Sequence, residues 1–357
     1  MKSLLKALLP FLLAFGTEIP AYAQETEWKT LNDEAVSLAK QGYYDRAVTV
    51  GEKALQVAAQ EMGPDNLNVA TSLNNLASLY QDQGQFAQAE PLYLRAIAIR
   101  EKVQGPGHPD LATNLNNLAE LYHDQGLYAQ AEPLYKRALA INEKAFGPDH
   151  PAVATSLNNL ATLYNDQRLY AQAEPFYKRA LAIKVKAFGP NNTSVATSLS
   201  NLASLYQDQG QFAKAEVFYK RAIAIREKVQ GPDHPDLATN LSGLAGVYRS
   251  QGLYAQAEPL YKRALAINER AFGPNHPAVA TILNNLGVFY DAQGQNAQAE
   301  PLYVRALAIR EKALGPDHPD VAQSLENLAV LFRETSRVKE AEANEKRAAA
   351  IRAITNR

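Results

Sequence analysis

Paired asparagines recur at a constant spacing along this chain, and they are the residues best suited to contact a ligand. Asn74 and Asn75 lie in the segment LNNLASLYQDQGQ, and near-copies of that segment return every 42 residues. An asparagine amide carries both a hydrogen-bond donor and an acceptor, as does the backbone of an extended peptide. The pattern therefore indicates recognition of a polypeptide main chain.

Five histidines also recur once per period, between one copy and the next. A metal site needs converging ligands, so a row of single histidines predicts no metal site, and we expect each of them to help cap the start of a helix. His123, which stands outside this row, is expected to be exposed. The five are His108, His150, His234, His276 and His318.

No catalytic constellation accompanies these residues. No serine, aspartate or glutamate stands out from its repeat with a base beside it, and the segment GPG at 105–107 lacks the preceding strand and the spacing of a phosphate-binding loop. We therefore expect a protein that is not an enzyme and needs no cofactor.

The elements that position the asparagines are two amphipathic helices per period. Leu73, Leu76, Ala77 and Tyr80 form one apolar face at helical spacing, and Gly84 ends that helix. The same spacing returns at Ala89, Tyr93, Ala96 and Ile97 on a second helix, which Gly105-Pro106 stops. Gly-Pro pairs end each period at 63–64, 105–106, 147–148, 189–190, 231–232, 273–274 and 315–316. A fixed period of this size is the signature of a solenoid.

These residues carry a family resemblance. Leu73, Leu76, Ala77 and Tyr80, followed by Gly84 and by alanines on the second helix, resemble the tetratricopeptide repeat, and the 42-residue period with LNNLA and GPDHPDVA is most similar to its kinesin-light-chain-like branch. The resemblance implies an all-α, right-handed superhelical solenoid of about eight helix pairs with a concave groove. It places the repeats near residues 27, 69, 111, 153, 195, 237, 279 and 321, the first of them divergent.

The array also has a longer period. Residues 69–110 and 195–236 differ at only six of 42 positions, and QGLYAQAEPLYKRALAINE occurs at both 125–143 and 251–269. The offset is three repeats, which indicates that a three-repeat block has been duplicated.

The resemblance implies a peptide-binding role for the second asparagine of each pair. If first helices lie about 10 Å apart, as packed helices do, each repeat spans about three residues of an extended peptide. The alternative is that the amides hydrogen-bond the neighbouring repeat and fix the register of the repeats. Ser200 and the pair Ser242-Gly243 are expected to interrupt the row. The predicted peptide-binding residues are Asn75, Asn117, Asn159, Asn201, Asn285 and Asn327.

The charged positions of the same helices suggest which ligand would fit. Asp82, Asp124, Asp166, Asp208 and Glu120 lie on the groove side of the N-terminal half, which favours a basic segment, although a solvated acidic face is the plainer reading. The net charge of the chain is only −1, which gives no support to a nucleic-acid partner. The expected partner is a protein or peptide.

The N-terminus predicts export. Two lysines precede the apolar stretch LLPFLLAF, and Ala21-Tyr22-Ala23 supplies a small-x-small cleavage pattern, so residues 1–23 are predicted to be a signal peptide and residues 24–357 a single array. We expect a periplasmic or secreted protein with no membrane span after cleavage. The chain has no cysteine, which excludes a disulfide framework.

Two functions remain open at this point. The first is a noncatalytic interaction scaffold that holds a peptide segment or partner helix in its concave groove. The second is a structural or self-associating spacer in a cell-envelope assembly, in which the groove is incidental. The sequence does not fix the oligomeric state.

Overall fold

The computed structural model describes residues 21–355, a segment that contains sixteen helices and no strand. The helices are α1 (Ala21–Lys40), α2 (Tyr44–Met62), α3 (Leu67–Asp82), α4 (Phe86–Gln104), α5 (Pro109–Asp124), α6 (Tyr128–Phe146), α7 (Pro151–Asp166), α8 (Tyr170–Phe188), α9 (Thr193–Asp208), α10 (Phe212–Gln230), α11 (Pro235–Ser250), α12 (Tyr254–Phe272), α13 (Pro277–Asp291), α14 (Asn296–Leu314), α15 (Pro319–Glu334) and α16 (Val338–Thr355).

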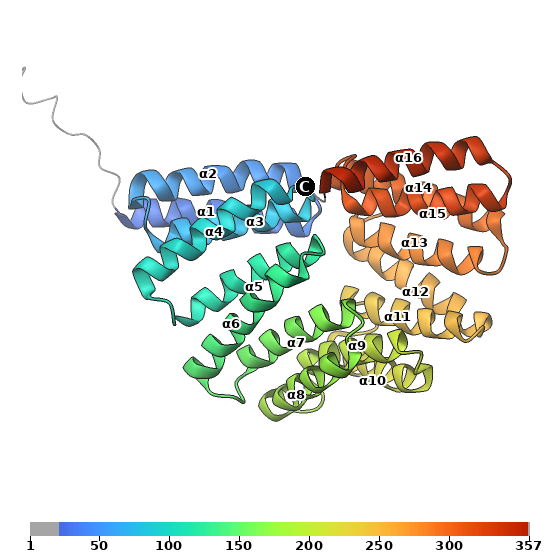
Figure 1. Cartoon of the computed structure of the whole chain (residues 1–357), viewed down its shortest axis with the longest axis horizontal. Helices are drawn as coiled ribbons and strands as arrows, with labels where there is room; N and C mark the ends of the chain where they lie inside the picture. The colour runs from blue at the N-terminus through green and yellow to red at the C-terminus, as the bar shows by residue number, and fades with distance from the viewer. Residues whose placement is uncertain (1–20, 356–357) are drawn as a thin grey trace, which may run out of the picture.

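Each odd-numbered helix packs against the even-numbered helix that follows it, and each pair stacks on the next. The odd-numbered helices lie on the inner side of the resulting curve and the even-numbered helices on the outer side (Figure 1). Each odd-numbered helix also contacts the next odd-numbered one, as α3 does α5. The solenoid of eight helix pairs predicted from the 42-residue period is therefore confirmed.

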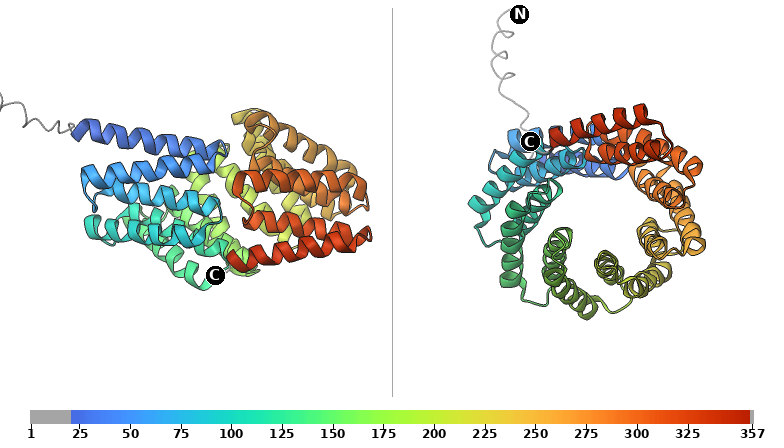
Figure 2. Two further views of the ribbon diagram at one scale, coloured as in Figure 1. Left: turned by 90° about the horizontal axis from the view of Figure 1, so that it is seen from above. Right: turned by 45° about the vertical axis from the view of Figure 1, so that its right-hand side comes forward.

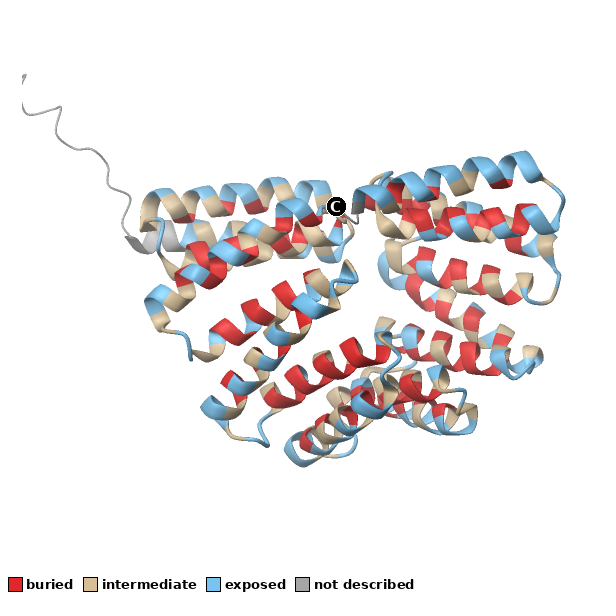
Figure 3. Ribbon diagram, in the orientation of Figure 1, coloured by how far each residue is buried: buried red, intermediate tan, exposed pale blue. Residues whose placement is uncertain are grey.

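Small and aromatic side chains alternate in the core between the repeats. Ala77 and Ala89 are completely buried, and Tyr93 from the second helix is 1% exposed. The alanines let helix backbones approach closely, and the tyrosine ring fills the space that remains between them. Buried positions lie along the sides of the helices that face their neighbours (Figure 3). The tyrosines at the same position of the other second helices form a column that is buried in the same way: Tyr135, Tyr177, Tyr219, Tyr261 and Tyr303.

The histidines of the inter-repeat segments cap the helices that follow them. His108 accepts a hydrogen bond on Nδ1 from the backbone N–H of Asp110 at 3.2 Å, and the other four histidines of the row do the same two residues ahead. Asn66 and Asn192 occupy the same position in the repeats that lack the histidine and accept the same bond at 2.8 Å. The predicted capping role is confirmed.

The array curls through about one turn, so that the first two repeats lie beside the last two (Figure 2). A methyl group added to Gly84 would lie 2.7 Å from Cδ of Pro319, and one added to Gly42 would lie 3.1 Å from Cδ2 of His276. We call this contact the seam: it joins the turns at residues 41–43 and 83–86 to the segments at residues 272–277 and 314–320. The chain is therefore a nearly closed ring.

The predicted signal peptide falls mostly outside the described residues, and it stays a prediction. Helix α1 begins at Ala21, two residues before the predicted cleavage point. Within residues 21–355, none of the helices has the length and apolar character that a bilayer crossing requires.

Gly243→Ala is expected to destabilise the array by about 1–3 kcal/mol, although alanine is the better helix former. Gly243 stands where six other repeats have the second asparagine, and an added methyl group would lie 2.5 Å from Cζ of the buried Tyr219. Denaturant unfolding followed by circular dichroism measures the change. Asn201→Ala, at the same position one repeat earlier, is the control, and an equal loss in both variants would contradict the overpacking argument.

Candidate functional site: the concave face

The inner side of the ring carries two rows of polar side chains that run from one odd-numbered helix to the next. In both rows a residue on one helix pairs with the residue 43 positions later, on the next inner helix. We call them the asparagine ladder and the carboxylate ladder. Together they make up the polar part of the concave face.

In the asparagine ladder, the second asparagine of a pair donates from Nδ2 to the first position of the preceding repeat. Four of the six predicted peptide-binding residues do this. The bonds run from Asn75 to Asn32 at 2.9 Å, from Asn117 to Asn74 at 2.9 Å, from Asn285 to Ser242 at 3.1 Å and from Asn327 to Asn284 at 2.7 Å. These four amide donors are engaged in holding neighbouring repeats in register.

Asn159 and Asn201 differ from the other four. Both are half-buried, and the side-chain amide of neither has a hydrogen-bond partner in the described part of the chain. Their counterparts on the preceding helices, Asn116 and Asn158, have a buried Oδ1 without a partner there. The middle of the ladder therefore keeps free hydrogen-bonding capacity on the concave face.

Ser242 continues the ladder, whereas the rung at Ser200 is missing because the residue 43 positions later is Gly243. Ser242 accepts from Asn285, and Ser200 accepts a hydrogen bond from Asn240. A hydroxyl oxygen accepts as well as an amide oxygen does, so Ser242 keeps its bond between repeats. The predicted interruption of the peptide contacts stays a prediction. Gly243 alone, which has no side chain to donate, leaves its place in the row empty.

The carboxylate ladder joins donors to the aspartates of the next repeat. Gln81 donates to Asp124 at 2.6 Å, and Asn165 donates to Asp208 at 2.7 Å. His123 pairs with Asp166 at 2.7 Å and has a side chain only 13% exposed, so the expectation that His123 is exposed is wrong. The signal that could have found this pair is its spacing of 43 residues, which the other rungs share.

Asp82 has no donor in this ladder, because the residue 43 positions earlier is Ala39. Loss of hydration, together with the nearby Glu120 and Asp124, raises the pKa of Asp82 to about 6. Burial also raises the pKa of Glu120 and that of Asp124. These carboxylates remain open to water within the hollow, while protein on several sides removes part of their hydration. They share a cavity of 430 Å³ at the seam in which no lysine or arginine takes part.

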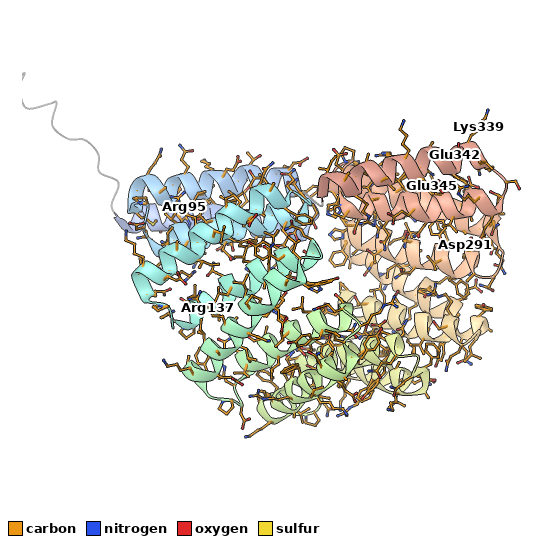
Figure 4. The ribbon with its side chains drawn as sticks, viewed as in Figure 1. Arg95, Arg137, Asp291, Lys339, Glu342 and Glu345 are labelled. Atoms are coloured by element: carbon orange, nitrogen blue, oxygen red, sulfur yellow. The ribbon has the colours of Figure 1, made fainter. Side chains whose placement is uncertain are left out.

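At the other end of the ladder two acidic groups face each other. Asp291 on α13 (Figure 4) stands where Asn165 stands in its repeat, and Glu334 stands where Asp208 stands. Loss of hydration and the charge of Glu334 raise the pKa of Asp291 to about 6, with a shared hydrogen bond between them. This rung holds together best when one of the two carboxyl groups keeps its proton.

The outer face neutralises itself. The predicted pairs at i and i+4 are present as ion pairs of 2.6–2.7 Å, for example Glu132 with Lys136. Arg137 on α6 (Figure 4) further reaches Glu101 of the preceding outer helix at 2.6 Å. Tyr164 of the inner helix α7 donates to the same Glu132 at 2.8 Å. These outer glutamates are therefore neutralised, whereas Asp82, Glu120 and Asp124 share a cavity on the concave face without a lysine or arginine.

Comparison with protein families agrees with this architecture. A tetratricopeptide repeat model matches residues 29–102, 70–144, 110–186, 194–270, 236–312 and 279–353. The chain belongs to the tetratricopeptide repeat family. Its repeats are of the kinesin-light-chain-like type, as the LNNLA pattern and the 42-residue period predicted. No curated protein sequence matches the chain.

Solved tetratricopeptide structures are similar to this one. BtubC (BKLC) from P. vanneervenii is 26% identical with a TM-score of 0.50, over 65% of this chain and 91% of that one. A Podosopora anserina protein described as a kinesin light chain with nearly identical TPR-like repeats is 26% identical with a TM-score of 0.47, over 57% and 97%. A Rap protein complexed with Competence and Sporulation Factor has a TM-score of 0.60 at 15% identity, over 94% and 99%, and shares the fold alone.

Tetratricopeptide repeat proteins generally mediate protein–protein interaction and are generally noncatalytic. Within residues 21–355, no group of three histidine, aspartate or glutamate side chains lies in an arrangement that could hold a metal ion. Neither observation identifies a partner. The kind of partner that fits this protein depends on the two ladders of the concave face.

Asp291→Asn is expected to stabilise the array at pH 7.5 and to leave its stability unchanged at pH 3.5. Because the folded state raises the pKa of this carboxyl from 3.8 to about 6, its stabilising contribution is full below 3.8 and is lost as the pH rises through about 6. An amide at this position would donate to Glu334 at every pH. Urea unfolding at the two pH values measures the effect.

Asn165→Asp is the matched control, because it places a second carboxylate beside Asp208 and is expected to lower stability at pH 7.5. Equal stability of Asp291→Asn and the natural chain at pH 7.5 would contradict the proton-sharing rung.

Proposed function

We propose that the chain is a noncatalytic scaffold that holds an extended, basic segment of a partner protein along its concave face. The observation that carries the proposal is the pair Asn159 and Asn201, whose amides lie half-buried on the inner face without a bond to the described residues. An extended peptide backbone offers the carbonyl and N–H groups that these amides lack.

The charge of the same face supports the basic character of the segment. Asp82, Glu120 and Asp124 have no lysine or arginine partner among the described residues. Asp166 and Asp208 continue the acidic row, paired with a histidine and an amide, and they share a cavity with Arg168. These carboxylates have lost part of their hydration and have no cation bound to them. They can therefore pair with lysine or arginine side chains of a ligand. On the outer helices α6, α8, α10 and α12, by contrast, the glutamates four residues before a lysine are paired with it.

The engaged asparagines have a different role in this proposal. Asn75, Asn117, Asn285 and Asn327 hold the inner helices in register through their Nδ2 donors. They set the spacing between neighbouring inner helices, while Asn159 and Asn201 in the middle of the array supply the free donors. The six predicted residues thus divide into positioning and contacting groups.

We also propose that the scaffold acts outside the cytoplasm, on the strength of the leader pattern at residues 1–23. Expression of the full chain in a bacterium, followed by fractionation and mass spectrometry of its N-terminus, tests this. The expected result is an exported protein that begins near Gln24. A full-length protein retained with the cytosol would contradict it.

Asn159→Ala combined with Asn201→Ala is expected to weaken binding of a lysine-rich unstructured peptide about tenfold, because two net hydrogen bonds of about 0.7 kcal/mol each are lost. Fluorescence anisotropy with a labelled peptide of about 20 residues measures the affinity. The fold should be unaffected, because neither amide bonds to another described residue.

Asn117→Ala combined with Asn285→Ala is the matched control. It removes two bonds between repeats, so it is expected to lower the unfolding midpoint and to affect affinity less. Loss of affinity in the control alone, or a protein that binds no peptide and forms oligomers in light scattering, would favour the structural spacer instead.

The same assay tests the charge argument. At 50 mM salt the lysine-rich peptide is expected to bind at least tenfold more tightly than a glutamate-rich peptide of the same length, and the difference should shrink at 500 mM salt because exposed charges are screened. Asp82→Asn with Asp124→Asn should reduce the difference. Equal affinity of the two peptides at low salt would contradict the basic ligand.

A further inference from the structure

The column of buried tyrosines on the outer helices is missing from the first repeat. Tyr93 on α4 is followed by a tyrosine every 42 residues as far as Tyr303 on α14, and each of these side chains is at most 6% exposed. The residue 42 positions before Tyr93 is Gly51, within α2. Glycine is a poor helix former and has no side chain. The first repeat therefore lacks the ring that fills the core of the repeats that follow.

A pocket of 280 Å³ lies beside Gly51, between α1, α2 and α3. Contacts of the ring in a later repeat show that the pocket stands in the place of the tyrosine. A methyl group at Gly243, 24 residues after Tyr219, would lie 2.5 Å from Cζ of that ring. The residue 24 positions after Gly51 is Asn75, which lines the pocket.

The hydroxyl end of the ring gives the same correspondence. Tyr93 donates from its hydroxyl to Oε1 of Gln81 at 2.9 Å, and Gln81 lies 12 residues earlier, on the inner helix of the same repeat. The residue 12 positions before Gly51 is Ala39, which also lines the pocket. The pocket therefore occupies the place that a tyrosine side chain takes in the other repeats.

The other end of the column is completed differently. The residue 42 positions after Tyr303 is Glu345 on α16 (Figure 4). Its carboxylate accepts hydrogen bonds from Nε and Nη2 of Arg333 at 2.6 and 2.7 Å. An ion pair thus takes the place of the ring in the last repeat, whereas the first repeat keeps an open pocket.

The pocket is apolar at its buried end and polar at its open end. A methyl group at Gly51 would lie 3.3 Å from Cδ1 of Leu79 and 3.4 Å from Cδ1 of Leu76, so aliphatic carbon surrounds the buried end. The open end is lined by half-buried or exposed polar residues of the concave face: Asn32, Asn75 and Asp82. A ligand can therefore reach the pocket from the concave face.

The size and the neighbours of the pocket indicate what would enter it. Sites for drug-sized ligands usually measure about 300–1,000 Å³, so 280 Å³ suits a single side chain better than a whole small molecule. Asp82 lines both this pocket and the 430 Å³ cavity that contains Glu120 and Asp124. Lys40, which is exposed, also lines the pocket. A segment with one side chain in the pocket brings its neighbouring residues to the acidic part of the concave face.

We propose that this pocket is a subsite for one phenylalanine side chain of the partner segment. The ring enters from the concave face, so its far edge ends beside Gly51, Leu76 and Leu79. A tyrosine hydroxyl would be buried there without a hydrogen-bond partner, which is unfavourable. Basic residues next to the phenylalanine then lie beside Asp82 and pair with it. This inference rests on the proposed function and adds to it that the basic segment carries a phenylalanine.

Three lysine-rich peptides of equal length, with phenylalanine, tyrosine or alanine at one central position, test the subsite by fluorescence anisotropy. The phenylalanine peptide is expected to bind about tenfold more tightly than the alanine peptide, because its ring leaves water, and the tyrosine peptide is expected to bind more weakly than the phenylalanine peptide. Equal affinity of the phenylalanine and alanine peptides, with both bound, would overturn the subsite and leave the proposed function intact.

Gly51→Tyr restores the column and fills the pocket. Tyr93 packs in one cluster with Leu118 and Leu121, the equivalents of the two leucines beside Gly51, so a ring and both leucines fit together. The variant is expected to unfold at a temperature no lower than the natural chain does. It should bind the phenylalanine and alanine peptides with equal affinity.

Gly51→Ala is the matched control, because it removes the helical glycine without adding a ring, and it should keep the preference for phenylalanine. Val36→Phe fills the pocket from α1 and should act as Gly51→Tyr does, so the test does not depend on the folding of one variant. A preference for phenylalanine that survives in both filled variants would overturn the subsite.

Toluene, which has the ring of phenylalanine, tests the pocket without a peptide. Saturation-transfer nuclear magnetic resonance is expected to detect toluene bound to the natural chain and to Gly51→Ala, but not to Gly51→Tyr. Equal binding of toluene to Gly51→Tyr and to the natural chain would contradict the assignment of the pocket. If toluene behaves as expected and no peptide binds, the aromatic pocket stands and the proposed basic segment fails. Dimers in light scattering that Gly51→Tyr dissociates would mean that a second copy fills the pocket, and would overturn the proposal.

Discussion

The structure depends on one constraint: a single helix pair cannot bury its own apolar side, so every repeat must stack on the next at a fixed spacing. Fully buried alanines such as Ala77 and Ala89 set how closely the helices approach, and the tyrosine column of the outer helices fills the space between them. Because the repeats are almost identical, the same small rotation accumulates at each step. The accumulated rotation brings residues 83–86 of the second repeat against residues 314–320, so the seam is a consequence of repeat geometry.

The same regularity lines up polar side chains at intervals of 43 residues on the concave face. Where donor and acceptor both occur, as for Gln81 and Asp124, the rung stabilises the stack. Where the donor is missing, as for Asp82 opposite Ala39, the structure keeps an unmet charge requirement. At Asn159 and Asn116 both groups are present, yet the acceptor oxygen of Asn116 has no partner among the described residues. Departures from the repeat, rather than the repeat itself, therefore give this surface its chemical character.

The sequence predicted most of the architecture because helical periodicity and capping are local. The 42-residue period predicted eight helix pairs, and the histidine of each His-Pro pair was correctly predicted to cap the helix that follows it. It could not predict the partner of His123 or the acceptor role of Ser242, since both depend on the offset between adjacent inner helices. The sequence could not predict the seam either, because the seam depends on a rotation summed over the whole array. The leader at residues 1–23 and the peptide contacts of the asparagines stay predictions.

The central claim is that the concave face of the N-terminal half receives a basic segment. Carbodiimide footprinting of carboxyl groups, read by mass spectrometry with and without a lysine-rich peptide, tests it most directly. The account predicts that the peptide protects Asp82, Glu120 and Asp124 on the inner helices and leaves Glu132 and Glu174 on the outer helices as reactive as before. Protection of the outer glutamates alone, or no protection at any of these residues, would contradict it.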